Sequence, residues 1–500
     1  MDYLTLTKYL APEIVLVLTA FAVLMLDLNV LRREPLPRRF AVLGSTTLGG
    51  LALAAALALW RLYWDPASFF ADTFVVDPLN GIFALIIIAI AALITLISLP
   101  EKFTVHVSEY YALILFAALG MEFMIFAEEL IMIFVSLELT AISLFALTAF
   151  DRAARRSIEA AIKYMLFGAL STAFLLFGMS YLCGLTGQTS LAGLSSALTS
   201  YAAGGWGESA IVALGVLLLL AGFGYKLAAA PFHGWAPDTF EGAPLPVTSY
   251  IASGSKVAAF LVAAKILITG LPALSGSALW GNGEPGWTLA LAAISAVSMV
   301  LGNLVAILQK NVKRLLAYSS IAHAGYILVG LLAFNRLGMT SLLYYIVIYA
   351  LTNIGAFAVL QIIAKESGGE TMADLAGAGR RSPLLALLMV ILVLSLAGVP
   401  PMGGFIAKFL VFAAAIKPDA ASFGLLWLVA LAVAANAVAL YYYLLILKQM
   451  YIIEPANPTR IKLPRTVTTA AALCVLAILY WGIFPQRLLA QLESMSARLF

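Results

Sequence analysis

The feature that most constrains this chain is the recurrence of apolar runs long enough to cross a lipid bilayer. A helical run of about 20 apolar residues spans the roughly 30 Å hydrocarbon core of a membrane. Of the 500 residues 63% are hydrophobic and 11% are charged, and the mean hydropathy is +1.02. The runs do not alternate with the period of two that membrane barrels require. The sequence therefore predicts an all-α polytopic membrane protein.

Charged or Gly/Pro-rich breaks divide the chain into about fourteen predicted transmembrane helices. Their limits are 10–31, 41–60, 81–99, 109–127, 130–149, 158–183, 209–230, 245–269, 287–309, 314–334, 339–364, 384–415, 422–447 and 466–485. The first run has no basic segment before it and no small-residue cleavage site after it. We therefore expect it to be kept as a helix rather than removed as a signal peptide.

Basic residues test the number of spans, because they concentrate in the cytoplasmic loops of membrane proteins. With fourteen spans and the N-terminus outside, the inner loops carry about three times as many lysines and arginines as the outer loops. An odd number of spans destroys this bias after the miscounted helix. We therefore expect both termini on the outer side of the membrane.

A weak internal repeat relates two parts of the chain. Lys226 and Lys408 lie 182 residues apart, and each follows a glycine-containing break, AGFGYK and PPMGGFIAK. GALST at 168–172 resembles YALTN at 349–353, and SLELTAIS at 136–143 aligns with YSSIAHAG at 318–325. Because five helices are an odd number, two five-helix repeats must be inverted relative to each other, each with a broken helix. The expected parts are three N-terminal helices (1–107), the first repeat (108–270), the inverted second repeat (287–448), and an inner loop, last helix and short tail (449–500).

One break places an amine inside an apolar run. The stretch AGVPPMGGFIAKF at 397–409 contains two prolines, two glycines and a lysine. Prolines and glycines free backbone groups from helical hydrogen bonds, and interrupted helices in membranes line cavities or are buried in protein. We expect this backbone to shelter the amine of Lys408, and Gly222 and Gly224 to loosen the helix before Lys226.

Four ionisable residues fall near the middle of predicted spans: Glu138, Lys226, Lys256 and Lys408. A charge at the bilayer centre costs at least about 2.5–3.5 kcal/mol, so such residues are candidates for function. Burial and a nearby carboxylate shift the pKa of a lysine in opposite directions, so we expect a Glu138–Lys226 pair to load and release a proton. One acid and three bases favour a proton relay over covalent chemistry. The alternative is an assembly scaffold in which these charges only fix helix packing.

Three further basic residues allow a functional or a structural interpretation. Lys163 lies four residues after Glu159, so an ion pair along one helix competes with a role in the relay. Lys265 lies near the outer end of its span, and we expect its amine to extend to the membrane interface. His323 lies at mid-membrane depth; its unperturbed pKa of about 6.5 suits a relay, and a neutral packing histidine is the alternative.

The inner loop PFHGWAPDTFEGAP is an exception to the charge bias. It contains His233, Asp238 and Glu241 and no basic residue. We expect this loop to form an inlet for protons or a contact surface.

Several kinds of binding site are missing from the sequence. There is no nucleotide-binding glycine motif, no CxxC and no clustered set of histidines and cysteines. Cys183 and Cys474 lie in separate apolar runs and are expected to be packing residues. We therefore expect no cofactor, metal or nucleic acid on this chain, and a driving energy that comes from a partner or an ion gradient.

Three motifs together resemble a known family. The segment FGYKLAAAPFHGWAPDTFEGAPLPVTSYIASGSKVAAF (223–260), AGVPPMGGFIAKF (397–409) and VSLELTAIS (135–143) resemble the antiporter-like subunits of respiratory complex I, and PDTFEGAPLPVT resembles the subunit N branch, the counterpart of mitochondrial subunit 2. The similarity extends over nearly all fourteen spans.

The resemblance implies roles for particular residues. In this family a glutamate of the fifth helix and lysines of the sixth, seventh, eighth and twelfth helices are the proposed proton path. They fall here on Glu138, Lys163, Lys226, Lys256 and Lys408.

The resemblance also implies partners and a location. Complex I couples electron transfer from NADH to quinone with proton pumping. NADH, flavin, iron-sulfur clusters and quinone would be bound by partner subunits, and this chain would be a non-redox proton-translocating subunit beside other antiporter-like membrane subunits. Mitochondrial versions from animals lack the first three helices, so fourteen spans favour a multi-pass protein of a bacterial inner membrane, with both termini on the periplasmic side.

Two relatives are alternatives. The D-type component of the multisubunit sodium/proton antiporters also has a lysine in its twelfth helix, and membrane subunits of energy-converting hydrogenases belong to the same family. The loop PDTFEGAP favours complex I. The subunit M type carries a glutamate where this chain has Lys408, and the subunit L type continues into a long lateral helix.

Overall fold

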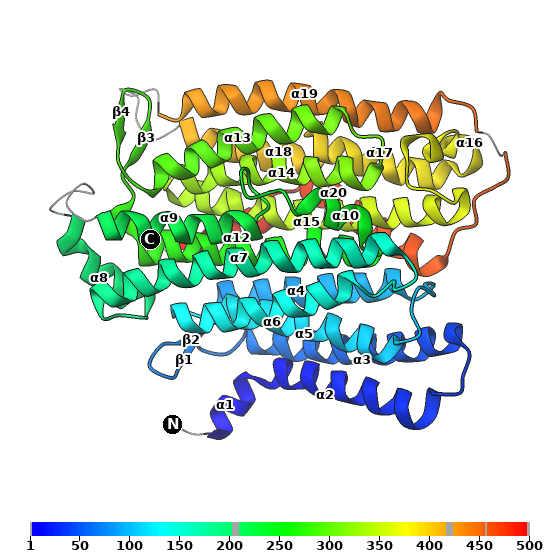
Figure 1. Cartoon of the computed structure of the whole chain (residues 1–500), viewed down its shortest axis with the longest axis horizontal. Coiled ribbons are helices and arrows are strands. Elements are labelled where there is room, and N and C mark those ends of the chain that lie inside the picture. Colours follow the sequence, from blue (N-terminus) through cyan, green and yellow to red (C-terminus); the bar gives the residue numbers. More distant parts are fainter. Residues whose placement is uncertain (1–2, 203–209, 417–423, 456–457, 498–500) are drawn as a thin grey trace.

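The structure is a computed structural model that describes residues 3–202, 210–416, 424–455 and 458–497. Most of the long helices lie side by side and run in roughly the same line, horizontally in Figure 1. The N-terminal end and the two short β-hairpins lie toward the left side of that view, and α16 lies toward the right. This arrangement is that of a helical bundle whose ends face opposite sides of a membrane.

The helices of the first half follow the predicted spans closely. Their bounds are α1 (Tyr3–Tyr9), α2 (Ala11–Leu26) with a π-helical turn (Asp27–Leu31), α3 (Leu36–Arg61), α4 (Pro78–Ser98), α5 (Val107–Phe126), α6 (Leu130–Thr148), α7 (Arg155–Thr186), α8 (Leu191–Ala202), α9 (Ala210–Lys226), α10 (Ala236–Gly242), α11 (Leu245–Ala252) and α12 (Gly254–Lys265) with a second π-helical turn (Ile266–Gly270).

The second half continues in the same way. Its helices are α13 (Trp287–Ile307), α14 (Val312–Leu332), α15 (Arg336–Ser367), α16 (Ala378–Arg381), α17 (Pro383–Ala397), α18 (Gly403–Ile416), α19 (Leu426–Tyr451), α20 (Arg465–Ile483) and α21 (Gln486–Ser496), with short 3₁₀ turns at Pro272–Leu274 and Met372–Leu375. Two antiparallel hairpins, β1 (Ala67–Phe69) with β2 (Phe74–Val76) and β3 (Ser277–Leu279) with β4 (Asn282–Glu284), cap loops at one end.

Within the described residues, twelve helices are long and apolar enough to cross a membrane. Two further predicted spans correspond to shorter helices: α9, and the pair α17 and α18. The prediction of an all-α polytopic membrane protein is confirmed, whereas the number fourteen stays a prediction. The span predicted at 384–415 is two helices with a gap at 398–402, because the Pro-Pro pair cannot continue a helix.

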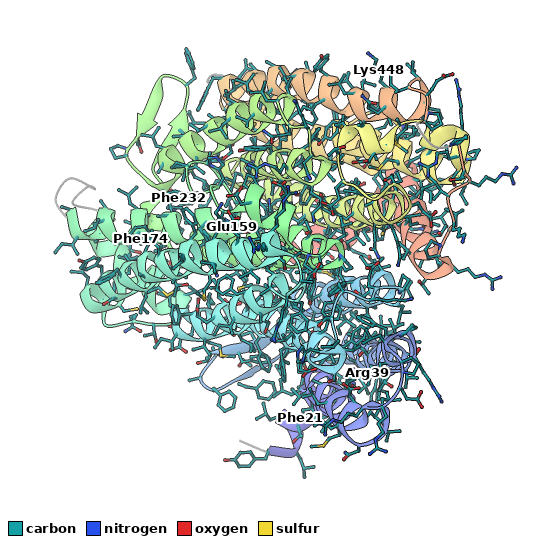
Figure 2. All side chains as sticks on the ribbon, turned by 45° about the vertical axis from the view of Figure 1, so that its right-hand side comes forward. Phe21, Arg39, Glu159, Phe174, Phe232 and Lys448 are labelled. Carbon is teal, nitrogen blue, oxygen red and sulfur yellow. The ribbon has the colours of Figure 1, made fainter. Side chains whose placement is uncertain are left out.

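The outside of the bundle is apolar, as a lipid-facing surface requires. Leu18, Phe21 and Met25 are more than half exposed along α2, and Leu166 and Leu170 are exposed along α7. Figure 2 shows such side chains on the outside, with Phe21 on α2. Because membrane hydrocarbon solvates these groups as well as a protein core does, their exposure fits contact with lipid or with other membrane subunits.

The helices that carry the candidate residues lie at the centre. In the most apolar stretches of Leu245–Gly270, Val312–Leu332 and Arg336–Ser367, 94% of the residues are buried, compared with 33% for Leu36–Arg61. Lys256 and His323 belong to these central stretches. Their side chains therefore face protein rather than lipid.

Candidate functional site

The break between α17 and α18 is built around two glycines. Gly398 ends α17 with a φ of 81°, and its N–H is donated to the carbonyls of Leu394 and Ser395. A Cβ at Gly404 would lie 1.9 Å from the carbonyl oxygen of Ser395. Only glycine allows the left-handed turn at the first position and the close approach of α18 to α17 at the second.

This break leaves carbonyl groups that hold the amine of Lys408. The Nζ of Lys408 donates to the carbonyl of Leu396 at 2.7 Å, to that of Ala397 at 3.4 Å, and to Oδ1 of Asn436. The first two are free carbonyls at the C-terminus of α17, where the helix dipole is negative. The amine also lies 4.9 Å from the ring centroid of Tyr326. The predicted sheltering of Lys408 by interrupted backbone is what the contacts display.

Lys226 is the last residue of α9, and aromatic side chains surround it. The indole of Trp235 donates to the carbonyl of Tyr225 at 3.0 Å, and the hydroxyl of Tyr225 donates to the carbonyl of Tyr164 at 2.7 Å. Trp235 stacks on Tyr164 with ring centroids 4.5 Å apart. These bonds fix the turn that follows Lys226.

The glycines before Lys226 act differently from the prediction. Both Gly222 and Gly224 lie inside α9. A Cβ at Gly222 would lie 2.8 Å from Cβ of Leu175, and one at Gly224 would lie 2.5 Å from the ring of Phe232. They allow neighbouring segments to pack closely and do not interrupt the helix, which ends only after them.

Glu138 and Lys226 do not form the predicted ion pair. Within the described part of the chain, the carboxylate of Glu138 accepts a hydrogen bond from the hydroxyl of Thr172 at 2.7 Å and joins no ion pair. Glu138 is the acidic group whose charge acts on Lys226 through space. The physical reason is that Thr172 on α7 draws the carboxylate toward the surface of the bundle.

A cavity of about 20 Å³ adjoins Lys226 and connects three elements of the predicted relay. Besides Lys226, it is lined by Thr140 on the helix of Glu138, by Ser255 beside Lys256, and by the hydroxyl-bearing Tyr225. A space of about 10–15 Å³ holds one water molecule when polar groups surround it. The cavity is therefore able to hold a water between Lys226 and the helix of Lys256.

Lys256 is 2% exposed and has only uncharged partners. Its Nζ donates to the carbonyl of Ser320 at 2.9 Å and to the hydroxyl of the same residue. The hydroxyl of Tyr349 donates to that serine oxygen at 2.7 Å. Within the described residues neither Lys256 nor Lys408 forms an ion pair with a carboxylate, so each amine can gain or lose a proton without breaking one.

His323 lies between these two lysines. Its Nδ1 is 3.0 Å from the hydroxyl of Tyr345, and its Nε2 is 3.3 Å from that of Tyr443. The charges of both Lys256 and Lys408 act on the imidazole. The mid-depth histidine thus occupies the position between the two lysines that a relay requires.

Tyrosines form the part of this network that the sequence interpretation missed. Tyr345 and Tyr349 lie four residues apart on α15 and bond His323 and Ser320. Tyr443 on α19 also bonds Ser319 at 2.5 Å. The (i, i+4) spacing in YYIVIYA was a signal for a shared face, but tyrosine is common in apolar cores, so the spacing alone does not indicate a relay.

A charged cluster, defined as Arg156, Glu159, Lys163, Asp238, Glu241 and Arg314, surrounds a polar cavity of about 190 Å³. Lys163 Nζ lies 2.7 Å from both Glu159 and Asp238. Arg314 lies 2.5 Å from Asp238 and 2.9 Å from Glu241. Both interpretations of Lys163 are thus present at once, the helical pair with Glu159 and a contact to the loop. Glu159 is labelled in Figure 2.

This cluster explains the acidic loop that broke the charge bias. Arg314 and Lys163, from other elements, neutralise Asp238 and Glu241. Burial raises the pKa of Asp238, but hydrogen bonds from Lys163 and Arg314 more than offset it and hold the pKa below its usual value. Asp238 therefore stays ionised at neutral pH, and the cavity is a wet, charged opening into the bundle.

The structure corrects the prediction for Lys265. Its side chain is 1% exposed and does not extend to the interface. The amine lies 2.5 Å from Glu128 and donates to the carbonyls of Ile125 and Ala127 at 2.9 and 3.1 Å. Those carbonyls are free because α5 ends at Phe126, so a buried amine is more favourable here than an extended one.

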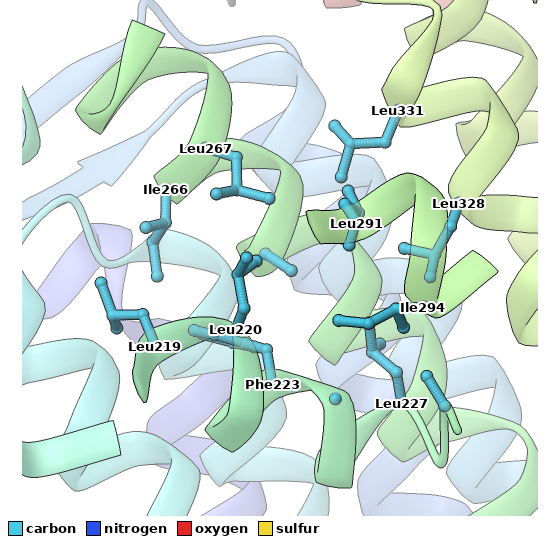
Figure 3. A pocket seen from close by; sticks show the side chains of 13 residues that line it. Leu219, Leu220, Phe223, Leu227, Ile266, Leu267, Leu291, Ile294, Leu328 and Leu331 are labelled. Atoms are coloured by element: carbon cyan, nitrogen blue, oxygen red, sulfur yellow. The ribbon is translucent and has the colours of Figure 1, made fainter. Parts of the chain in front are cut away.

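A dry cavity of about 20 Å³ closes the relay on one side (Figure 3). Leu220 and Phe223 of α9, Ile266 and Leu267 of the π-helical turn, and Leu328 of α14 point toward it. An apolar space of this size stays empty of water. It separates the lysines from the end of the bundle that carries the β-hairpins.

No group of three or more potential metal ligands gathers within the described residues. Cys183 and Cys474 are both free thiols. The fold and the site together define a polytopic helical membrane protein in which interrupted helices hold buried lysines. A model of the family described as NADH:quinone oxidoreductase/Mrp antiporter, TM matches residues 127–436. With the relatives described next, the chain belongs to the NADH-quinone oxidoreductase subunit N family.

Two relatives extend over almost the whole chain. The NADH-quinone oxidoreductase subunit N 2 of Acidobacterium capsulatum is 41% identical, with 91% of this chain and 92% of the relative covered. The protein of the same name from Herpetosiphon aurantiacus is 40% identical, with 98% of each covered. The resemblance inferred from three motifs is therefore confirmed over the full length.

Solved structures agree in fold and separate in sequence. A chain of respiratory complex I from Thermus thermophilus with bound Aureothin has a TM-score of 0.77 and 33% identity, covering 96% of this chain and 98% of that one. A chain of the Mrp complex from Dietzia has a TM-score of 0.82 but 19% identity, covering 99% and 98%. The second likeness establishes the fold alone, so sequence identity separates the subunit N family from the Mrp alternative.

Proposed function

We propose that this chain is a proton-translocating, non-redox membrane subunit of a bacterial NADH:quinone oxidoreductase. The observation that carries this proposal is that Lys256 and Lys408 are buried amines with only uncharged partners, with His323 and its tyrosines between them. A buried amine without a carboxylate is easily switched between charged and neutral forms by its surroundings. Proton transfer through such groups requires no cofactor on this chain.

The proposed path begins at the charged cluster. Its polar cavity of about 190 Å³ admits water from the side that carries Arg156 and Arg314. Lys163 is the first amine on this path, and Glu138 with Lys226 forms the next station. Because Glu138 and Lys226 act on each other through space rather than by contact, a proton on one changes the affinity of the other.

The second part of the path runs through the centre. A water in the cavity beside Ser255 connects Lys226 to Lys256. From there Ser320, Tyr349, His323 and the tyrosine hydroxyls lead toward Lys408, which is the proposed exit station. The direction from the cytoplasmic side to the periplasmic side is part of the proposal, as are fourteen spans and periplasmic termini.

Local features support the proposed inverted repeat. Helices α7 and α15 both contain 32 residues, and each ends before a left-handed glycine, Gly187 and Gly368, 181 residues apart. The break after Lys226 and the break before Lys408 lie in corresponding parts of the two units. An offset of 181–182 residues is the one that the sequence motifs predict.

Partners follow from the surface around Glu138. This residue lines an open, mainly apolar groove of about 610 Å³ between α6 and α7, together with Ile142, Ile162 and Met165. An ionisable group facing lipid is costly, so we infer that a neighbouring antiporter-like membrane subunit covers the groove. NADH, flavin, iron-sulfur clusters and quinone belong to other subunits of the proposed complex, in the bacterial plasma membrane.

The experiment that tests the function is proton pumping by the assembled complex in proteoliposomes. Lys226→Ala or Glu138→Ala is expected to lower the ratio of protons pumped to electrons transferred, or to slow coupled turnover. Lys448→Ala, a lysine near the end of α19, is the matched control. Normal coupled rates in both variants would remove the proposed roles.

Co-purification separates this proposal from the antiporter and hydrogenase alternatives. Under the proposal, quinone-reducing subunits purify with this chain. Co-purification with sodium/proton antiporter subunits or with a hydrogenase, in the absence of quinone-reducing subunits, contradicts it.

A further inference from the structure

Three charged side chains that the proposed relay does not use are buried together beside the N-terminal helices. Glu13 on α2 is 2% exposed, Arg61 at the end of α3 is 3% exposed, and Glu122 on α5 is 0% exposed. The Nη1 of Arg61 donates to both oxygens of Glu13, at 2.8 and 3.0 Å, and to the carbonyl of Tyr9 at 2.8 Å. The guanidinium lies 4.8 Å from the ring centroid of Phe126.

Glu122 is unpartnered in this group. Both of its carboxyl oxygens are buried without a hydrogen-bond partner, as are Nε and Nη2 of Arg61. The charges of Glu13 and Arg61 both act on Glu122. Unpaired buried oxygens and unpaired buried donors in one cluster mean that something small is still to be bound there, because unsatisfied buried polar groups are costly.

Charge balance indicates what is bound. Two ionised glutamates and one arginine would leave one uncompensated negative charge inside the bundle. A buried unpaired charge is strongly unfavourable, and a carboxyl in that position takes up a proton instead. A proton on Glu122 also supplies an O–H donor and removes the repulsion with Glu13.

The cluster has a connection to the surface. Arg61 lines a cavity of about 10 Å³ beneath the β1–β2 hairpin, with Asp65 and Asp77 on its other walls. That volume is about the size of one water molecule. The remaining titratable group near Glu122 is Tyr250 on α11, whose hydroxyl donates to the carbonyl of Ile114 at 3.2 Å.

We propose that Glu13, Glu122 and Arg61 form a proton-binding site that holds one proton between the two carboxyls and exchanges it through the cavity under the β1–β2 hairpin. The site is additional to the lysine path and does not depend on it. Glu122 would hold the proton in its resting form, and Arg61, which contacts both Glu13 and the cavity, would control its exchange.

Infrared difference spectroscopy of the whole purified complex tests this site, by following the C=O stretching band of protonated carboxylic acids in H2O and D2O. The band is expected to lose one carboxylic acid in Glu122→Gln and in Glu13→Gln, because each variant leaves one carboxylate balanced by Arg61. Arg61→Gln is expected to gain one acid, because both carboxyls then need a proton. Glu109→Gln is the control, since Glu109 lies near the other end of α5 with a side chain 49% exposed.

Three outcomes would overturn the proposal. The first is an acid band that is the same in the unmodified complex and both glutamine variants. The second is failure of both glutamine variants to assemble while Glu109→Gln assembles, because both keep the charges balanced. The third is radioactive sodium bound by the unmodified complex and lost in Glu122→Gln, which would make the ligand a metal cation rather than a proton.

Discussion

Lys226 and Lys408 both adjoin a break in a helix, yet their surroundings differ in charge and in access to water. Lys226 is partly buried, feels the charge of Glu138, and adjoins a cavity that is about 20 Å³ in size. Lys408 is 4% exposed and is held by two carbonyls and Asn436. The difference teaches that the first station is controlled by a neighbouring charge and by water, whereas the last is controlled by fixed dipoles and hydrogen bonds.

The largest effect is expected from Lys408→Gln. Glutamine keeps an N–H donor for the carbonyls of α17, so the helix break is still satisfied, but it does not titrate. Proton translocation through this chain should be abolished while the complex assembles normally. Proton-to-electron ratios in proteoliposomes and complex yield check both parts, and an unchanged ratio would break the comparison at its buried end.

Lys226→Arg tests the charged end and is expected to be the next most severe. Arginine keeps the positive charge beside Glu138 but stays protonated in proteins, so it does not release a proton. We expect coupled turnover to fall by a factor of about 10²–10⁴, the range for losing an acid–base group. An assembly scaffold would tolerate this change, so near-normal turnover would favour the scaffold.

His323→Gln tests the connection between Lys256 and Lys408. Glutamine preserves hydrogen bonding to the hydroxyls of Tyr345 and Tyr443 but removes the titrating imidazole. We expect turnover to fall by roughly tenfold to a hundredfold, less than for either lysine, because water can partly replace a relay group. His106→Gln, at a histidine whose side chain is 42% exposed, is the control and should leave turnover unchanged.

Tyr443→Phe sharpens the comparison by removing one hydroxyl from the buried end. The loss of its bonds to Ser319 and His323 is expected to cost about 1 kcal/mol, which corresponds to roughly fivefold in rate. Stopped-flow measurement of proton release checks this value. An equal effect from Tyr225→Phe on the proton release step would show that the two ends do not differ in this respect.

The smallest effect is expected at the charged cluster. Asp238 is ionised at neutral pH because Lys163 and Arg314 lower its pKa. Asp238→Asn removes one charge from a group whose members are partly exposed, and such pairs contribute about 0–1 kcal/mol. We expect coupled turnover to fall less than fivefold and to become less sensitive to salt concentration.

Apolar runs determine much of this fold, and much of it was therefore predictable. The helices of the structure follow the predicted spans, and the PPMGG break and its lysine were predicted from residue types that interrupt helices. Charge bias and motifs located Glu138, Lys226, Lys256 and Lys408. These features depend on local composition, which the sequence displays directly.

Features that depend on long-range packing were not predictable. Thr172, 34 residues after Glu138, holds that carboxylate away from Lys226. Lys265 is buried because α5, about 140 residues earlier, ends where its carbonyls can accept the amine. The arrangement of Tyr345, Tyr443 and His323 likewise needs three helices that only the folded bundle brings together.

Lys256 provides the most direct test, because it lies between the water-accessible and the dipole-controlled ends. The measurement is the number of protons pumped per electron by the complex carrying Lys256→Gln in sealed vesicles, beside Lys448→Gln as the control. The account predicts fewer protons per electron in Lys256→Gln and an unchanged number in Lys448→Gln. An unchanged number at an unchanged rate of electron transfer in both variants would contradict it.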